Sequence, residues 1–279
     1  MTGTLTQDQI FEKICPMELV NDQITASLTK LYDQELNGSR YFYYQDNNGI
    51  PLGKILPEEG SQHTFCKMTD TIIFDGQCWG RAPGIPGTIW PPTCLDDLIG
   101  SPELSEHCIC DAGIENCDCD YQVVSAKLKE YWIEHILLQP VLHCGIGAFA
   151  RVRIKAESPV AEYTGTIVAQ DSEVCSKNRN YRAKISIRGQ VGSHHAADID
   201  ASSVGSIARF LNHSCRPNCK LWEGRCGRQR RMLYIRAVRD IERGEELTLN
   251  YGPGWFVTPD ERCHCGARTC RNRVRVAKR

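Results

Sequence analysis

The sequence contains no apolar run that could span a membrane, since none approaches the roughly 18 uninterrupted apolar residues that a spanning helix needs. Its first residues, MTGTLTQDQIFEK, lack the basic start and the apolar block of a secretory signal peptide. Internal repeats and low-complexity tracts are also missing, and the hydrophobic fraction of 41% is ordinary for a globular protein. We therefore expect the 279 residues to form one large folded domain or two modest ones, with no membrane span.

Cysteine, by contrast, is abundant, with 16 residues in the chain. Disulfides are rare in reducing compartments, so clustered cysteines in a chain without an export signal indicate zinc first. The sequence thus predicts at least one structural metal site.

The net charge of −1 hides an uneven distribution of charged residues. Residues 1–144 carry 8 Lys and Arg against 21 Asp and Glu, whereas residues 145–279 carry 25 against 13. An acidic half of charge −13 is therefore joined to a basic half of charge +12. Such a split can mark a surface for a charged polymer, although two solvated faces of opposite sign explain it equally well.

The acidic half offers four local predictions. Apolar residues at roughly helical spacing predict a helix within residues 1–36, and runs on both sides of Asn47-Asn48-Gly49 predict a hairpin. The Gly- and Pro-rich stretch 75–102 favours irregular backbone. The segment 125–139 predicts a helix that begins at Ser125 and is ended by Pro140.

From about residue 141 the pattern changes to short strand-like runs separated by Gly, Asn or Asp. The runs are ARVRIKA, PVAEYTGTIVA, YRAKISI and MLYIRAV. Many short strands with loops between them indicate a β-rich domain.

The strongest spacing signal is Cys263-His-Cys265 followed by Cys270. A structural zinc needs four ligands, so this group lacks one. Cys215 is the best donor if the chain brings it near, and His264 is the local alternative, although it would point away from its flanking cysteines in an extended segment.

A second group places four thiols within twelve residues, at Cys108, Cys110, Cys117 and Cys119. These could complete a tetrahedral zinc site alone, or share metals with Cys66, Cys78 and Cys94, or be buried free thiols in part. The isolated cysteines are expected to pack in the core; they are Cys15, Cys144, Cys175, Cys219 and Cys226.

Four segments of the basic half carry motifs, namely CGIGAFA at 144–150, EYTG at 162–165, RFLNHSCRPNC at 209–219 and GEELTLNYG at 244–252. A lone Gly-x-Gly is a weak signal. Together with the terminal cysteine motif, however, the set resembles a SET-domain protein-lysine (histone-lysine) methyltransferase with a post-SET zinc segment. The motifs occur in the family's order over residues 141–271.

The resemblance implies a β-rich mixed α+β fold, in which small curved sheets form a pseudo-knot where the Asn-His-Ser-Cys segment passes under the final Tyr-bearing loop. It implies an N-terminal acidic region 1–140 with a divergent pre-SET-like zinc cluster as a candidate. A SET catalytic domain 141–256 and a post-SET zinc segment with a basic tail, 257–279, would follow. Cys215 would then be the fourth ligand of the terminal zinc.

The family binds S-adenosylmethionine on one face and the target lysine on the other, joined by a narrow channel. By resemblance, Tyr251 is the catalytic tyrosine, which would orient the amine toward the methyl group, and Tyr181 is a candidate channel aromatic beside it. Tyr163 is a further channel candidate, unless it is simply a packed strand residue. The residues implied for cofactor binding are Gly145, Ile146, Gly147, Arg209, Phe210, Asn212 and His213.

Two departures from the family pattern matter. Leu249 stands where many relatives carry Phe or Tyr, which indicates a roomier channel and hence di- or trimethylation. The tail after Cys270 holds no aromatic residue to cover the adenine, so an aliphatic such as Val274 would have to make any contact from the tail.

The resemblance implies a histone H3 tail as substrate, and nuclear (chromosomal) location follows only from that. An acidic surface would suit a Lys- and Arg-rich tail, and the basic half could contact nucleosomal DNA phosphates. Two alternatives remain open: a non-histone protein substrate, or a catalytically silent SET scaffold that binds chromatin. The intact Asn212, His213 and Tyr251 argue against silence.

Overall fold

The computed structural model describes residues 43–45, 51–54, 67–79, 90–100, 107–110, 117–142, 144–170, 179–187, 196–252 and 263–270. The helix predicted within residues 1–36 lies outside the described residues, as do Cys15, Cys66, Cys175 and Val274. None of the helices in the described part is long and apolar enough to cross a membrane.

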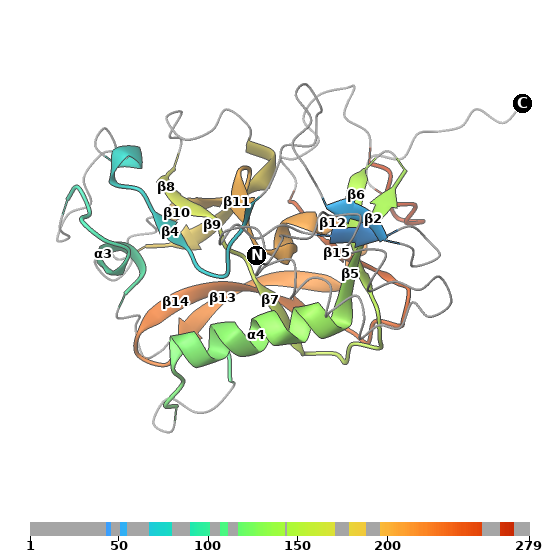
Figure 1. Cartoon of the computed structure of the whole chain (residues 1–279), viewed down its shortest axis with the longest axis horizontal. Coiled ribbons are helices and arrows are strands. Elements are labelled where there is room, and N and C mark those ends of the chain that lie inside the picture. Colours follow the sequence, from blue (N-terminus) through green and yellow to red (C-terminus); the bar gives the residue numbers. More distant parts are fainter. Residues whose placement is uncertain are drawn as a thin grey trace, which may run out of the picture.

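Most of the regular structure in the described residues consists of short strands in small sheets, as expected from the basic half (Figure 1). One four-stranded sheet has the order β4-β8-β10-β9, made of Ile73–Phe74, Thr166–Ala169, Ala196–Asp200 and Arg182–Ser186. A three-stranded antiparallel sheet has the order β13-β14-β7, made of Cys219–Cys226, Arg230–Ala237 and Pro159–Glu162. Isoleucines from the sheets join one core, including the fully buried Ile167, Ile185, Ile199 and Ile235.

A third sheet carries three of the motifs singled out in the sequence, in the order β12-β15-β6-β5. Its strands are Asn212–His213, Glu246–Leu249, Gly145–Ala150 and Ile136–Val141. Two smaller pairs complete the strands, β1 (Tyr43–Gln45) with β2 (Pro51–Lys54), and β3 (Lys67–Met68) with β11 (Val204–Gly205). The antiparallel β1–β2 pair confirms the hairpin predicted around Asn47-Asn48-Gly49.

Helix α4 (Tyr121–His135) lies against β7 and runs alongside the β13–β14 hairpin (Figure 1). The bounds predicted for it, 125–139, were wrong at both ends. It begins earlier because the side chain of Asp120 caps it by accepting a hydrogen bond from the Val123 N–H. It ends earlier because residues 136–141 pair with β6, and Pro140 is tolerated in β5 because this strand is at the sheet edge.

The run ARVRIKA is also corrected, since it forms no strand beyond its first residue. Strand β6 ends at Ala150, and Ile154 makes only an isolated bridge to Ile241. The chain bends at Arg151, where the buried guanidinium donates to the Ile133 carbonyl. The described part of 75–102 holds only the short helices η1 (Gly76–Cys78) and α3 (Asp96–Ile99), in line with the irregular backbone predicted there.

Candidate active site and metal centres

The candidate active site forms where strand β12 passes beside strand β15. The two strands are parallel, with Asn212 opposite Thr248 and His213 opposite Leu249, and the Ser214 N–H donates to the Leu249 carbonyl at 2.8 Å. Strand β6 flanks β15 on its other side. Three motifs that are far apart in the sequence therefore meet in one small sheet, which is the crossing that the resemblance implied.

The Gly-x-Gly strand lies directly against Asn212. The Asn212 side-chain amide donates to Glu246 Oε1 at 2.8 Å and to the Ile146 carbonyl at 3.4 Å. A Cβ atom at Gly147 would lie 2.5 Å from Glu246 Oε1 and 3.0 Å from the Asn212 amide nitrogen. A side chain at residue 147 would therefore displace Glu246 and Asn212, and Gly145 has a positive φ of 79°, which favours glycine.

His213 connects Tyr251 to the terminal cysteines. The Tyr251 backbone N–H donates to His213 Nδ1 at 3.1 Å, and His213 Nε2 lies 3.4 Å from Cys215 Sγ. The two rings meet edge to face, with centroids 5.5 Å apart. A change at the cysteines can therefore reach the tyrosine through one side chain.

The hydroxyl of Tyr251 is fixed as a hydrogen-bond donor, because it donates to the Leu211 carbonyl at 2.7 Å. Burial, together with the nearby Tyr181, raises the pKa of Tyr251 above its ordinary value. The phenol therefore stays neutral near pH 7, and its oxygen keeps lone pairs that can accept from a substrate N–H.

The predicted channel residues Tyr181 and Tyr163 form a second group with Arg209 and Phe210, which the resemblance assigned to the cofactor. The Arg209 guanidinium carbon lies 4.0 Å from the Tyr181 ring centroid and 4.9 Å from that of Phe210. Tyr163 is buried, and its hydroxyl donates to the Tyr181 carbonyl at 2.8 Å. Leu249 is also buried, and it joins Tyr181 and Tyr251 in the core cluster.

Two residues of the site were not singled out from the sequence, although both lie within its motifs. Glu246 holds the Asn212 amide, and its pKa is raised by burial and lowered in part by that hydrogen bond. Asn218 is buried and holds strand β15 in place, since its amide donates to the Glu246 carbonyl and its Oδ1 accepts from the Thr248 N–H. Their motif membership was the available signal.

The terminal cysteines meet Cys215, as predicted. The Sγ atoms of Cys215, Cys263, Cys265 and Cys270 lie within 4.8 Å of one another, and Cys215 Sγ is 3.9 Å from that of Cys263 and 3.8 Å from that of Cys270. Burial raises the pKa of Cys265, but hydrogen bonds from the Cys215 and Ala267 N–H groups lower it to about 7. His264, the local alternative ligand, is exposed and not part of this group.

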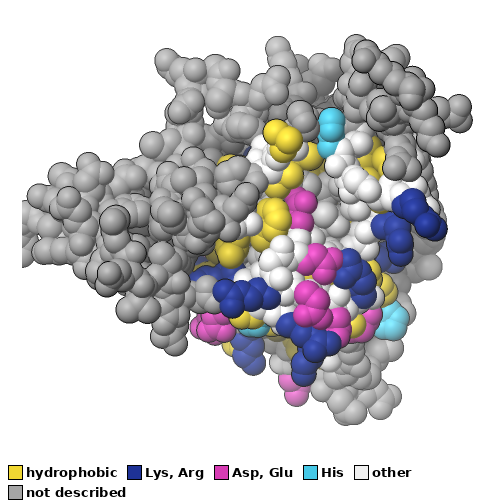
Figure 2. Space-filling view, turned by 90° about the vertical axis from the view of Figure 1, so that its right-hand side faces the viewer, with side chains coloured by type: hydrophobic (Ala, Val, Ile, Leu, Met, Phe, Trp, Pro, Cys, Tyr) yellow, Lys and Arg dark blue, Asp and Glu magenta, His cyan; other side chains and the backbone are white. Residues whose placement is uncertain are grey.

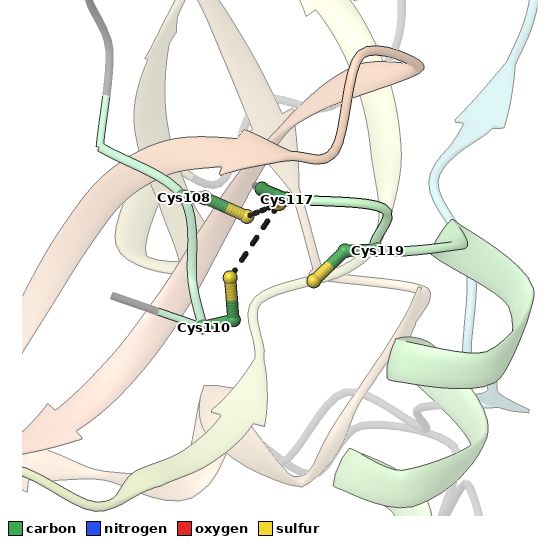
Figure 3. A group of neighbouring side chains, drawn as sticks. All are labelled: Cys108, Cys110, Cys117 and Cys119. Atoms are coloured by element: carbon green, nitrogen blue, oxygen red, sulfur yellow. Dashed lines mark hydrogen bonds between the residues drawn. The ribbon is translucent and has the colours of Figure 1, made fainter. Parts of the chain in front are cut away.

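The second cysteine group also converges (Figure 3). Cys108 and Cys110 face Cys117 and Cys119, which lie just before α4, and all four Sγ atoms lie within 4.8 Å of one another. Cys117 Sγ is 3.0 Å from Cys108 Sγ and 3.5 Å from Cys110 Sγ. Burial raises the pKa of Cys117, but hydrogen bonding with Cys108 and other neighbours lowers it to about 6.

Both groups have the donor chemistry of a structural zinc site. Four sulfurs bound at about 2.3 Å around one tetrahedral zinc lie about 3.8 Å apart, and the thiolate is the form that binds. The Sγ–Sγ distances from Cys215 to Cys263 and to Cys270, 3.9 Å and 3.8 Å, match this spacing. Among the described residues, Cys78 and Cys94 belong to neither group.

The prediction that isolated cysteines pack in the core is mixed in outcome. Cys219 and Cys226 are buried, as expected. Cys144 is exposed, so the prediction was wrong for it. The physical reason is its place in the turn between β5 and β6, where its N–H donates to the Val141 carbonyl and its side chain is left at the surface.

Figure 2 shows Lys and Arg side chains interleaved with Asp and Glu side chains on the face that it presents. Within the basic half, Arg153 pairs with Asp240, and Arg239 pairs with Glu245. These pairs leave the net charge of +12 unchanged, because that figure already counts the acidic residues.

Comparison with known proteins agrees with these motifs. Residues 145–252 match the SET domain family. The chain is 30% identical over 200 residues to "Histone-lysine N-methyltransferase mes-4" of Caenorhabditis elegans, covering 66% of this chain and 20% of that protein. It is 33% identical over 134 residues to "Histone-lysine N-methyltransferase, H3 lysine-36 specific" of Cryptococcus neoformans, covering 45% and 15%.

Among solved structures, the chain is similar to "crystal structure of KRYPTONITE in complex with mCHH DNA, H3(1-15) peptide and SAH", with a TM-score of 0.39 and 26% identity, covering 49% of this chain and 29% of that one. The chain spans about a fifth or less of the curated relatives named above. The matched segment coincides with the strands that build the candidate site, and the chain contains a SET domain.

Proposed function

We propose that this chain is an S-adenosylmethionine-dependent protein-lysine methyltransferase that acts on a histone H3 tail. The observation that carries the proposal is the crossing of β12 and β15, which sets Asn212 beside the Gly-x-Gly strand and His213 beside Tyr251. The family match over residues 145–252 supports it, as does the histone-lysine activity in the names of the relatives.

The cofactor, when bound, supplies an electrophilic methyl group on a sulfonium. The fit of this chain rests on the backbone at Gly145 and Gly147, which carries no side chain to keep a ligand away, and Gly145 has a positive φ of 79°. Asn212 and His213 would hold the cofactor from strand β12, with Ile146, Arg209 and Phe210 also assigned to its site by resemblance. Glu246 orients the Asn212 amide through the hydrogen bond at 2.8 Å.

The target lysine must be neutral to act as a nucleophile, and its free pKa is about 10.4. An apolar channel disfavours the ammonium because burial penalises charge. Tyr251 would then accept from the amine while its own O–H donates to the Leu211 carbonyl, which fixes the amine's direction. Most of the rate would come from this alignment. Tyr181, Tyr163 and Leu249 would form the channel.

We assign zinc to both cysteine groups, with different roles. The ion held by Cys215, Cys263, Cys265 and Cys270 would fix the wall of the active site, because Cys215 contacts His213. The ion held by Cys108, Cys110, Cys117 and Cys119 would fix the start of α4. We retain the division into an N-terminal region 1–140, a SET domain 141–256 and a post-SET segment 257–279.

A histone substrate places the protein in the nucleus. The acidic half, of charge −13, supports a Lys- and Arg-rich partner. The net charge of +12 supports contact of the basic half with nucleosomal DNA, through residues other than Arg153 and Arg239, which pair with acidic groups. If both charge effects operate, substrate binding weakens as salt is raised.

The test is transfer of labelled methyl groups from S-adenosylmethionine to core histones, H3 peptides and a cell extract, with the label mapped by mass spectrometry. Label on an H3 lysine supports the proposal, and label only on other proteins favours a non-histone substrate. No transfer to any of them favours the silent scaffold.

The matched variants are Tyr251→Phe and Tyr131→Phe, which each remove one hydroxyl. We expect Tyr251→Phe to lower kcat by at least about 100-fold, because alignment of the amine is lost. Tyr131 stacks on His135 in α4, away from the crossing, so its variant should keep full activity. Full activity of Tyr251→Phe would refute the assigned role.

A further inference from the structure

Arg209 is held in a way that the proposed function does not explain. It lies in the short helix η4 (Ile207–Phe210) and is only 7% exposed. Its Nε donates to the Ala201 carbonyl at 2.8 Å, and its Nη2 donates to the Ser202 carbonyl at 3.4 Å. The guanidinium is thus fixed by two main-chain groups of one turn.

The flat face of this guanidinium supports Tyr181. Its carbon lies 4.0 Å from the centroid of the Tyr181 ring, which is the distance of a close cation–π contact. A buried cation–π pair is stronger than an exposed one because water does not compete. A lysine cannot copy the arrangement, since its ammonium lacks a planar face and the fork of donors.

The backbone of Tyr181 is fixed by the same turn. The Tyr181 carbonyl accepts from the Tyr163 hydroxyl at 2.8 Å and from the Ala201 N–H at 2.9 Å. Ala201 therefore holds both partners, because its N–H binds the Tyr181 carbonyl and its carbonyl binds Arg209. Ring and backbone of Tyr181 are each restrained by a separate contact.

We propose that Arg209 is a positioning residue for the lysine channel, which fixes the ring of Tyr181, and that it is not a ligand of the cofactor. Tyr163 fixes the backbone of Tyr181, because its hydroxyl donates to the Tyr181 carbonyl. The inference rests on the proposed function in that it assigns the channel to a lysine substrate. It replaces the cofactor role that the resemblance gave to Arg209.

The decisive kinetic experiment is a double-mutant cycle with Arg209→Lys and Tyr181→Ala. We expect Arg209→Lys alone to lower kcat/KM for an H3 peptide by about 10- to 100-fold, mainly through a higher peptide KM. The Kd for S-adenosylhomocysteine should change by less than about twofold. In the Tyr181→Ala background the same substitution should have little further effect, because its target is gone.

Two outcomes overturn the inference. Loss of S-adenosylhomocysteine binding in Arg209→Lys would restore the cofactor role. An undiminished effect of Arg209→Lys in the Tyr181→Ala background would show that Arg209 acts elsewhere. Tyr163→Phe, which removes one hydroxyl, should raise the peptide KM about threefold to tenfold without changing cofactor binding.

A spectroscopic measurement decides the point without activity. With 3-fluorotyrosine at residue 181, we expect the fluorine resonance to shift and broaden in Arg209→Lys and in Tyr163→Phe. The matched control is Arg236→Lys, whose guanidinium lies over Trp222 instead. An unchanged resonance in both test variants overturns the inference even if the wild-type chain transfers no methyl group, a result that would refute only the proposed function.

Discussion

The two four-cysteine groups have the same ligand chemistry but different attachments to the rest of the molecule. The Cys215 group touches the candidate active site directly, since His213 lies between Cys215 and Tyr251. The group of Cys108, Cys110, Cys117 and Cys119 instead contacts the β13–β14 hairpin, where the Gly227 N–H lies 3.5 Å from Cys108 Sγ. The Cys215 group is therefore part of the candidate active site, whereas the Cys108 group is part of the packing between the β13–β14 hairpin and the segment before α4.

The second group also explains a glycine. Gly227 has a positive φ of 55°, and a Cβ there would lie 2.1 Å from the Cys119 carbonyl oxygen. The hairpin turn and the segment before α4 are therefore packed backbone against backbone. A metal's effect on function therefore depends on what its ligands contact, so loss of the first ion should lower activity and loss of the second should lower stability.

The largest expected effect is on the catalytic side. Cys263→Ser should remove one zinc and lower kcat/KM by at least about 100-fold, because the segment that positions His213 loses its anchor. Metal analysis and methyl transfer measure both. Loss of one zinc with full activity retained would show that the Cys215 group does not support the active site.

The matched substitution on the supporting side is Cys119→Ser, at a similarly half-buried cysteine. It should also remove one zinc, but lower Tm by about 10 °C and leave activity of the folded protein within about threefold. Thermal unfolding and activity at low temperature separate the two effects. A catalytic loss as large as that of Cys263→Ser would show that the groups are equivalent.

A third prediction concerns the link between α4 and the strand that leads to Tyr163. The Tyr121 hydroxyl donates to the Glu162 carboxyl at 3.2 Å, and burial raises the pKa of Glu162 to about 8. In the unfolded chain this group ionises near 4.5. The folded protein therefore binds this proton more tightly than the unfolded chain. The contribution of Glu162 to the free energy of unfolding is fully present below about pH 4.5 and is lost as pH rises through 8.

Glu162→Gln imitates the protonated form and should remove this loss. In denaturant unfolding, the free energy of unfolding of the variant minus that of the wild type should rise by on the order of 2 kcal/mol between pH 6 and pH 8. A difference that does not vary with pH would contradict the raised pKa.

The smallest effect is on the product. Leu249→Phe should reduce the number of methyl groups added per lysine, because a larger side chain narrows the channel, while the first transfer changes by less than about threefold. Leu221→Phe, on strand β13, is the control. Mass spectrometry of the product resolves the methylation states, and an unchanged distribution would exclude Leu249 from the channel.

Features that depend on local residue patterns or on the order of motifs could be predicted from the sequence. Cys215 could be assigned as the partner of the terminal cysteines, and the β1–β2 hairpin followed from its turn residues. The role of Glu246 and the contact of Gly227 with the Cys108 group could not be predicted, because they depend on pairings between distant segments. The end of α4 was missed because pairing with β6 overrode its helical pattern.

The most direct test is the mapping of labelled methyl groups on histone H3 after incubation with S-adenosylmethionine, with Tyr251→Phe measured beside the wild type. We predict label on a lysine side chain with the wild-type chain and at least about 100-fold less with the variant. Equal label from both proteins, or none from the wild type on any substrate, would contradict the proposed activity.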